Sequence, residues 1–105
     1  KSILKKYQLK TTEAFYGVLY TDAMDFQTIK SALDNAQKRG YKTIEILIHP
    51  AYANDPRDKI YTSKLVNKYI HSKARRTETS AALSKKIKNL LSSPIIKLSS
   101  FRDLN

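Results

Sequence analysis

The sequence predicts an α/β fold built around one parallel βαβ unit. Two segments rich in β-branched and aromatic residues, 14–19 and 43–48, flank a segment with helical periodicity, 25–40. Short apolar runs bounded by turn residues are typical of strands, and apolar residues spaced by three and four are typical of an amphipathic helix. A strand, a helix and a strand in this order form a right-handed crossover with parallel strands. We therefore expect a parallel sheet with helices packed against it.

The composition is that of a globular protein with one domain, residues 1–105. Hydrophobic residues make up 41% of the chain, enough for a modest core. The absence of cysteine excludes disulfides, zinc fingers, iron–sulfur clusters and thiol nucleophiles. No apolar run approaches the length of a membrane span. Together these features favour a cytoplasmic protein.

The first part of the chain gives the clearest local signals. Residues 2–10 have the apolar spacing of a helix end, and a loop over residues 20–25 follows the first strand. Asp25 can cap the next helix with its carboxylate, and Gly40 can end it. The helix itself is predicted by an apolar stripe at spacings of three, four and three, formed by Phe26, Ile29, Leu33 and Ala36.

The second strand, residues 43–48, ends in a reactive side chain. Its isoleucines share one face, which can pack under the helix, and the strand stops at His49 and Pro50. A loop over residues 49–62 is expected to follow, because it is rich in proline, asparagine and aspartate. A buried strand that presents a histidine at its carboxyl end is the most conspicuous chemical feature of the sequence.

The remaining segments are predicted to be mainly helical. Ser63 can cap a short amphipathic helix, and residues 73–77 form a basic break or continuation after it. Apolar residues at helical spacing predict another helix over residues 81–91, which Pro94 ends. Residues 95–98 are expected to form a third strand.

The net charge is +11, and most of the excess lies in the second half of the chain. Residues 51–105 contain 12 basic and 4 acidic residues, against 8 and 5 in residues 1–50. Such a field attracts polyanions, so a basic module that binds nucleic acid is an alternative function. A solvated, lysine-rich helix surface is the simpler interpretation of the same residues.

Five short motifs occur in a fixed order along residues 13–104. They are an aromatic strand (15–19), a loop with methionine (Asp22-Ala23-Met24), a strand ending in Glu45-x-x-x-His49-Pro50-Ala51, the pair Arg75-x-x-Glu78, and an apolar segment with the tail Ser100-Phe101-Arg102-Asp103-Leu104. In this order they resemble the C-terminal part of the YdjC-like carbohydrate deacetylases, closest to the branch associated with hopanoid biosynthesis. Thr79 stands where that family usually has leucine.

The resemblance implies a fragment of a distorted (β/α) barrel from a hydrolase that removes acetyl groups from N-acetylated sugars. It also implies a divalent metal, Mg or Zn, in the complete enzyme. The family binds that metal with an aspartate and two histidines from an N-terminal part that has no counterpart in this sequence. We therefore expect no metal ligands in this chain, and little or no activity from the chain alone.

Four residues are predicted to serve the reaction. His49 is the candidate catalytic residue, as the acid for the leaving amine; the alternative is a histidine that only caps the strand end. Asp22, Tyr52 and Arg75 are the candidate substrate contacts. Asp22 lies in the loop after the neighbouring strand, Tyr52 could stack on a sugar ring, and Arg75 could equally form an ion pair with Glu78.

A sheet of few strands leaves its edges open, which makes a partner part of the prediction. The partner could be a second copy of the chain or a chain that carries the N-terminal half of the enzyme. A protein-interaction fragment that completes another protein's sheet is the third functional alternative. The expected ligand of the completed enzyme is an N-acetylated sugar.

Overall fold

The two strands of the predicted βαβ unit pair with each other as a parallel sheet. In the computed structural model, which describes residues 2–51 and 63–104, Ala14 lies opposite Ile44 and Tyr16 opposite Ile46. The elements in chain order are α1 (Ser2–Lys6), β1 (Ala14–Tyr16), α2 (Phe26–Lys38), β2 (Ile44–Ile46), α3 (Lys64–Ile70), α4 (Lys73–Leu83), α5 (Lys85–Leu91) and the short 3₁₀ helix η2 (Phe101–Leu104). A parallel sheet with helices agrees with the predicted α/β class, whereas the barrel stays a prediction.

Both strands are shorter than the sequence predicts. β1 ends at Tyr16 because Gly17 turns the chain away with a φ of 114°. The ladder continues by one further bond, from the Leu47 amide to the Tyr16 carbonyl at 2.8 Å. At the other end the Glu13 carboxylate accepts the backbone N–H groups of Lys42 and Thr43, and these bonds hold the pKa of Glu13 below its ordinary value. The pairing is therefore fixed at both ends by specific contacts.

Helix α2 begins and ends where its capping residues predict. The Asp25 carboxylate accepts the Thr28 backbone N–H at 2.9 Å, and this bond lowers the pKa of Asp25. At the other end Gly40 has a φ of 71°, and its amide donates to the Gln37 carbonyl at 3.0 Å. Each cap satisfies backbone groups that the helix itself leaves without a partner. The Tyr16 hydroxyl also donates to Asn35 at 2.8 Å, which ties β1 to α2.

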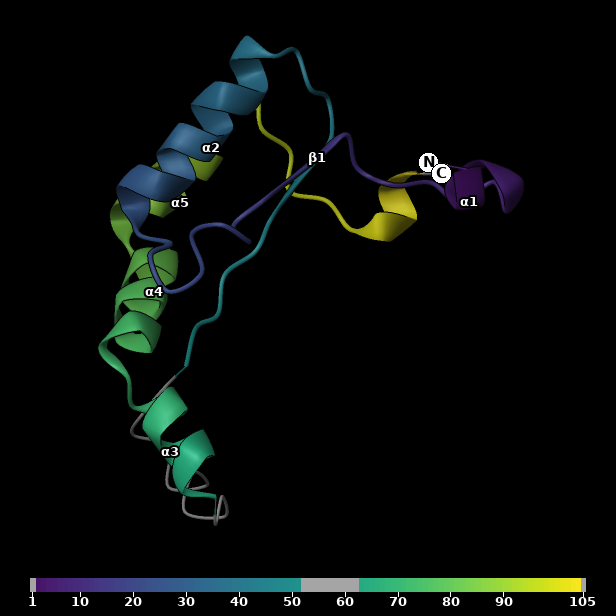
Figure 1. The fold of residues 1–105 in the computed structure, drawn as a ribbon. Helices are drawn as coiled ribbons and strands as arrows, with labels where there is room; N and C mark the ends of the chain where they lie inside the picture. The colour runs from purple at the N-terminus through teal and green to yellow at the C-terminus, as the bar shows by residue number, and fades with distance from the viewer. Residues whose placement is uncertain (1, 52–62, 105) are drawn as a thin grey trace.

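The hydrophobic core lies between β2 and the helices. Its buried cluster consists of Met24, Ile29, Ala81 and Ile87, and Ile46 and Ile48 pack against it from the strand side. This confirms that the isoleucine face of the second strand packs under the helices, although Ile44 lies outside the cluster. Figure 1 shows α2, α5 and α4 gathered along one side of the molecule, with the strands crossing beside them. The core thus joins the βαβ unit to the C-terminal helices.

The prediction of one helix over residues 81–91 was wrong, because Ser84 divides that segment. Helix α4 extends from Lys73 to Leu83 and includes the basic residues that the sequence left as a break or a continuation. The Ser84 hydroxyl donates to the Ala81 carbonyl at 2.8 Å and accepts the Ile87 amide at 3.2 Å. A serine that bonds backbone groups on both sides competes with the helical ladder, so it ends α4 and caps α5.

The third strand predicted over residues 95–98 was also wrong. That segment has no strand geometry, and Ile95 and Leu98 are 71% and 73% exposed. The composition of residues 95–98 favours a strand, but a strand forms only when it pairs with a neighbouring strand. Within residues 2–51 and 63–104 the sheet consists of β1 and β2 alone. The chain is correspondingly open: its radius of gyration is 16.5 Å, against about 13 Å for a compact domain of this length.

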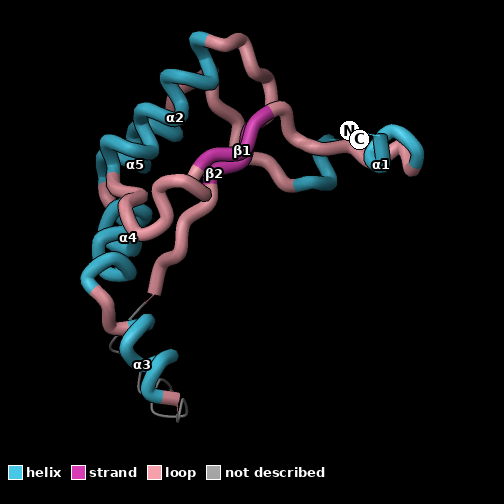
Figure 2. Tube along the Cα trace, in the orientation of Figure 1, coloured by secondary structure: helices cyan, strands magenta, loops and turns pink. Residues whose placement is uncertain are grey.

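In the described part of the chain, apolar side chains on and next to β1 are exposed. Phe15 on β1 is 52% exposed, and Val18 just after it is also exposed. Figure 2 shows the strands lying between the helical side of the molecule and the separate α1. Among the described residues, no helix has the length and apolar character needed to cross a membrane. Phe15 and Val18 therefore present apolar surface on the described part of the chain.

Gly17 provides a stability test of the strand pairing. Gly17→Ala is expected to lower the free energy of unfolding by about 2–3 kcal/mol, because a φ of 114° strains any other residue. A Cβ there would also lie 2.5 Å from the Leu47 carbonyl oxygen. Urea unfolding followed by circular dichroism measures the change. Gly40→Ala is the matched control, because its φ is also positive but nothing lies within 4 Å of the added Cβ. Equal losses for the two variants would contradict a close approach of the strands at Gly17.

Candidate active site at the end of strand β2

Four ionisable side chains from three segments meet at the carboxyl end of β2. His49 follows the strand, Asp22 lies in the loop between β1 and α2, and Arg75 and Glu78 lie one turn apart on α4. We call these four residues the His49 cluster. The carboxyl ends of parallel strands are where α/β proteins place their reactive groups. Arg75 contacts both Asp22 and the His49 carbonyl.

The backbone of His49 is held on both sides by α4. Its N–H donates to the Glu78 carboxylate, and its carbonyl accepts a hydrogen bond from Arg75 Nη1 at 2.6 Å. Two residues later, the Ala51 amide donates to Thr79 Oγ1 at 2.9 Å. These bonds replace the ladder that the chain loses when β2 ends, so the segment after the strand is fixed in place although it is irregular.

Arg75 and Glu78 form a buried ion pair at the centre of the cluster. Neither side chain has exposed surface, and the guanidinium Nη1 lies 3.4 Å from Glu78 Oε2. The guanidinium also pairs with the Asp22 carboxylate and lies over the Tyr69 ring, 4.9 Å from its centre. Buried charges persist only when they are paired and hydrogen-bonded, and here each charge has several partners. The i,i+3 pair expected from the sequence is confirmed, within a larger network.

The imidazole of His49 presents its two nitrogens to different surroundings. Nδ1 is buried, lies 3.8 Å from Glu78 Oε2, and makes no hydrogen bond to the described atoms. The side chain as a whole is 31% exposed, so its exposed surface lies on the rest of the ring, which carries Nε2. A histidine held in this way can exchange a proton with a molecule outside the protein while one ring edge stays against a carboxylate.

The other predicted site residues differ in their exposure to solvent. Asp22 is 60% exposed and adopts a φ of 74°, which aspartate tolerates better than most residues. Arg75 is enclosed, and its guanidinium is bound to Asp22, Glu78 and the His49 carbonyl. Tyr52 lies outside the described residues. Asp22 and His49 therefore form the accessible part of the site, and Arg75 forms its buried support.

Two supporting residues were missed as parts of the site in the sequence. Glu78 was recognised only as the partner of Arg75, and Thr79 only as a departure from leucine. A usable signal was present, because Arg75, Glu78 and Ala81 recur every three residues and are the buried residues of α4. Charged residues on the buried stripe of a helix need partners in the fold, which here are His49 and Asp22.

The described residues do not fit the divalent metal that the resemblance implies for the complete enzyme. They contain no group of three or more histidine, aspartate or glutamate side chains that could hold a metal ion. The carboxylates of Asp22 and Glu78 are already bound to the Arg75 guanidinium, whose positive charge would repel a cation. Any metal in the reaction therefore requires other ligands.

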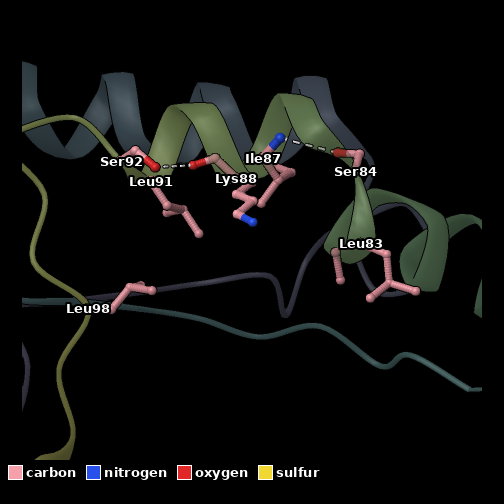
Figure 3. A pocket seen from close by; sticks show the side chains of 8 residues that line it. Leu83, Ser84, Ile87, Lys88, Leu91, Ser92 and Leu98 are labelled. Carbon is pink, nitrogen blue, oxygen red and sulfur yellow. Dashed lines mark hydrogen bonds between the residues drawn. The ribbon is translucent and has the colours of Figure 1, made fainter.

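A hollow on the described surface is separate from this cluster. It has a volume of about 380 Å³ and lies at the junction of α4 and α5, where Leu83, Ile87, Leu91 and Leu98 line it. Figure 3 shows these side chains around an open groove between α5 and the segment that carries Leu98. None of the four cluster residues lines it.

Comparison with known proteins assigns the chain to a family. No curated protein and no solved structure matches the sequence. A family model described as YdjC-like protein matches residues 1–93, and this range includes β1, β2, His49 and the whole of α4 and α5. The match covers most of the 105 residues, and the chain therefore belongs to the YdjC-like protein family.

Proposed function

We propose that this chain is the C-terminal part of a metal-dependent deacetylase of N-acetylated sugars, and that it supplies the acid of the reaction. The observation that carries the proposal is the His49 imidazole at the end of β2, fixed through its backbone and partly open to solvent. Membership of the YdjC-like family supports the carbohydrate deacetylase class.

The chemistry asked of His49 is one proton transfer. Hydrolysis of an N-acetyl group adds water to the acetyl carbonyl, breaks the C–N bond and releases acetate. The departing nitrogen is a poor leaving group until it takes a proton, which His49 Nε2 would donate. The proton lost by the water goes to a base outside this cluster, because Glu78 and Asp22 are both bound to Arg75. The chain thus performs one half of an acid–base pair.

Substrate contact falls to Asp22 in this proposal, with Tyr52 as a stacking surface. The Asp22 carboxylate is mostly exposed and is held by Arg75, so it can accept a hydrogen bond from a sugar hydroxyl without moving. Arg75 then serves binding by fixing Asp22 and the chain at His49, rather than by direct contact. Carbohydrate sites commonly combine fixed polar acceptors of this kind with an aromatic face.

The remaining parts of the enzyme would come from a partner chain that carries the N-terminal half. That partner would hold the Mg or Zn ion and the base, and it would cover the exposed apolar side chains of Phe15 and Val18. A second copy of this chain would bring the same four residues again, and no further metal ligands from the described part. For this reason we favour a different partner over a homo-oligomer.

Complementation tests the proposed function directly. A YdjC-like deacetylase is truncated ahead of its own Glu-x-x-x-His-Pro strand, mixed with residues 1–105, and assayed for acetate release from N-acetylglucosamine oligomers. We expect activity from the mixture and none from either chain alone. The positive control is the same truncated enzyme mixed with its own C-terminal part. Activity in that control, but none with residues 1–105, would overturn the proposal.

Asp22→Asn separates substrate contact from proton transfer. The amide keeps the shape of the carboxylate but weakens the hydrogen bond to a sugar hydroxyl, so KM is expected to rise about 5- to 20-fold with kcat little changed. The measurement is the dependence of acetate release on substrate concentration in the complemented assembly. Asp34→Asn is the matched control, because Asp34 is exposed on α2 and pairs only with Lys30 among the described contacts. A fall in kcat at constant KM would argue against a binding role for Asp22.

A further inference from the structure

Glu78 contacts His49 in addition to its ion pair with Arg75. The same carboxylate oxygen, Oε2, accepts the His49 backbone N–H, accepts from Arg75 Nη1 and lies 3.8 Å from His49 Nδ1. Glu78 has no exposed surface. One buried carboxylate thus contacts the main chain of the candidate catalytic residue and faces its ring.

The buried Nδ1 of His49 needs a partner, and among the described residues the Glu78 carboxylate lies 3.8 Å from it. Nδ1 makes no hydrogen bond to the described atoms, and a buried polar atom without a partner destabilises the fold. A carboxylate accepts hydrogen bonds but cannot donate them, so Nδ1 can be matched to Glu78 only if it carries a proton. We expect the ring to close the present gap of 3.8 Å between Nδ1 and Glu78 Oε2 to hydrogen-bond length in solution.

The charges around the His49 ring also favour a proton on Nδ1. The ionised groups near His49 are Glu78 and Arg75 on α4, which hydrogen-bond its backbone, and Asp22 in the loop before α2, which pairs with Arg75. Two carboxylates and one guanidinium leave one negative charge in excess, which attracts an N–H directed into the cluster. Arg75 orients the Glu78 carboxylate, because Nη1 lies 3.4 Å from Oε2 and Nη2 lies 3.5 Å from Oε1.

We infer that Glu78 is a positioning residue that holds His49 as the Nδ1–H tautomer and leaves Nε2 as the atom that gains and gives the proton. The inference rests on the proposed function and names which nitrogen performs the transfer. Carboxylate–histidine contacts fix the tautomer and the ring orientation in this way at other catalytic sites. Glu78 does not itself touch the substrate, because it is enclosed behind the ring.

The tautomer can be observed in the chain itself, without substrate or partner. Long-range ¹H–¹⁵N correlation spectra of ¹⁵N-labelled residues 1–105, recorded above the pH at which imidazoles are charged, distinguish a protonated nitrogen from an unprotonated one. We expect Nδ1 of His49 to be protonated and Nε2 to be unprotonated. In Glu78→Gln, the ratio of the Nδ1–H to the Nε2–H tautomer is expected to fall roughly tenfold or more, because a charge-assisted hydrogen bond is lost.

Two controls keep the result specific. Asp34→Asn removes a carboxylate that lies outside the His49 cluster and pairs with Lys30 on α2, so the tautomer of His49 is expected to stay the same. His71 is an internal reference, because its Nδ1 lies 2.8 Å from the Asn67 carbonyl and has no described contact with Glu78, so it should not respond to either substitution. If Glu78→Gln does not fold, the wild-type spectrum alone decides the matter.

A wild-type His49 in the Nε2–H form, or an unchanged tautomer ratio in folded Glu78→Gln, would overturn the role of Glu78. Either result would leave the complementation assay as the separate test of the proposed function. Conversely, failed complementation would not alter a tautomer observed in the isolated chain.

Discussion

Arg75→Ala is expected to lower the free energy of unfolding by about 3–5 kcal/mol. The substitution leaves the Glu78 carboxylate buried without its cation, and a buried charge that loses its partner is among the most destabilising changes known for single residues. It also removes the hydrogen bond to the His49 carbonyl and releases the Asp22 carboxylate. Since small domains are stable by only about 5–15 kcal/mol, much of the folded population would be lost.

Urea unfolding followed by circular dichroism measures this change, with Arg76→Ala as the matched control. Arg76 lies next to Arg75 on α4, but its side chain is exposed and donates only to the His71 carbonyl among the described contacts. Its loss should cost no more than about 0.5–1 kcal/mol. Similar losses for the two arginines would show that the buried ion pair is not the centre of this part of the fold.

His49→Ala is expected to reduce kcat for deacetylation about 10²- to 10⁴-fold in the complemented assembly. This is the range that general acid catalysis contributes when the proton donor is removed. The fold should survive, because the contacts of His49 with Glu78 and Arg75 pass through its backbone, which alanine retains. KM should change little, because the proposed substrate contacts are Asp22 and Tyr52.

His71→Ala is the control for this prediction. His71 is the only other histidine in the sequence, and its side chain is exposed near the end of α3. Its substitution should leave kcat within about twofold of the wild-type value. A fall in activity common to both variants would point to a general effect of histidine removal on the assembly rather than to catalysis by His49.

Local signals in the sequence were sufficient to predict the βαβ unit. The Asp25 cap, the apolar stripe and the Gly40 end lie within one helix, so α2 could be placed without knowledge of its neighbours. The third strand could not be placed in this way. Residues 95–98 have the composition of a strand, but whether they become one depends on a neighbouring strand, which is a property of the whole assembly.

In the candidate site, too, the sequence predicted the local feature but not the contacts between residues that lie far apart in the chain. The position of His49 at the end of an apolar strand is a local feature, and the structure places it there. The enclosure of Arg75 and the contact between Glu78 and His49 join residues that are 26 and 29 positions apart. Such contacts depend on how α4 packs against the end of β2. The periodicity along α4 indicates which of its residues are buried, but it does not indicate which residues of other elements they contact.

The claim that His49 donates a proton to the leaving group is tested most directly by changing the leaving group. An N-acetyl amine needs a proton to depart, whereas the phenolate of an activated aryl acetate does not. In the complemented assembly we expect His49→Ala to slow release of acetate from the amide about 10²- to 10⁴-fold, but from the aryl ester less than about tenfold. Equal slowing of both substrates, or of neither, would contradict the account.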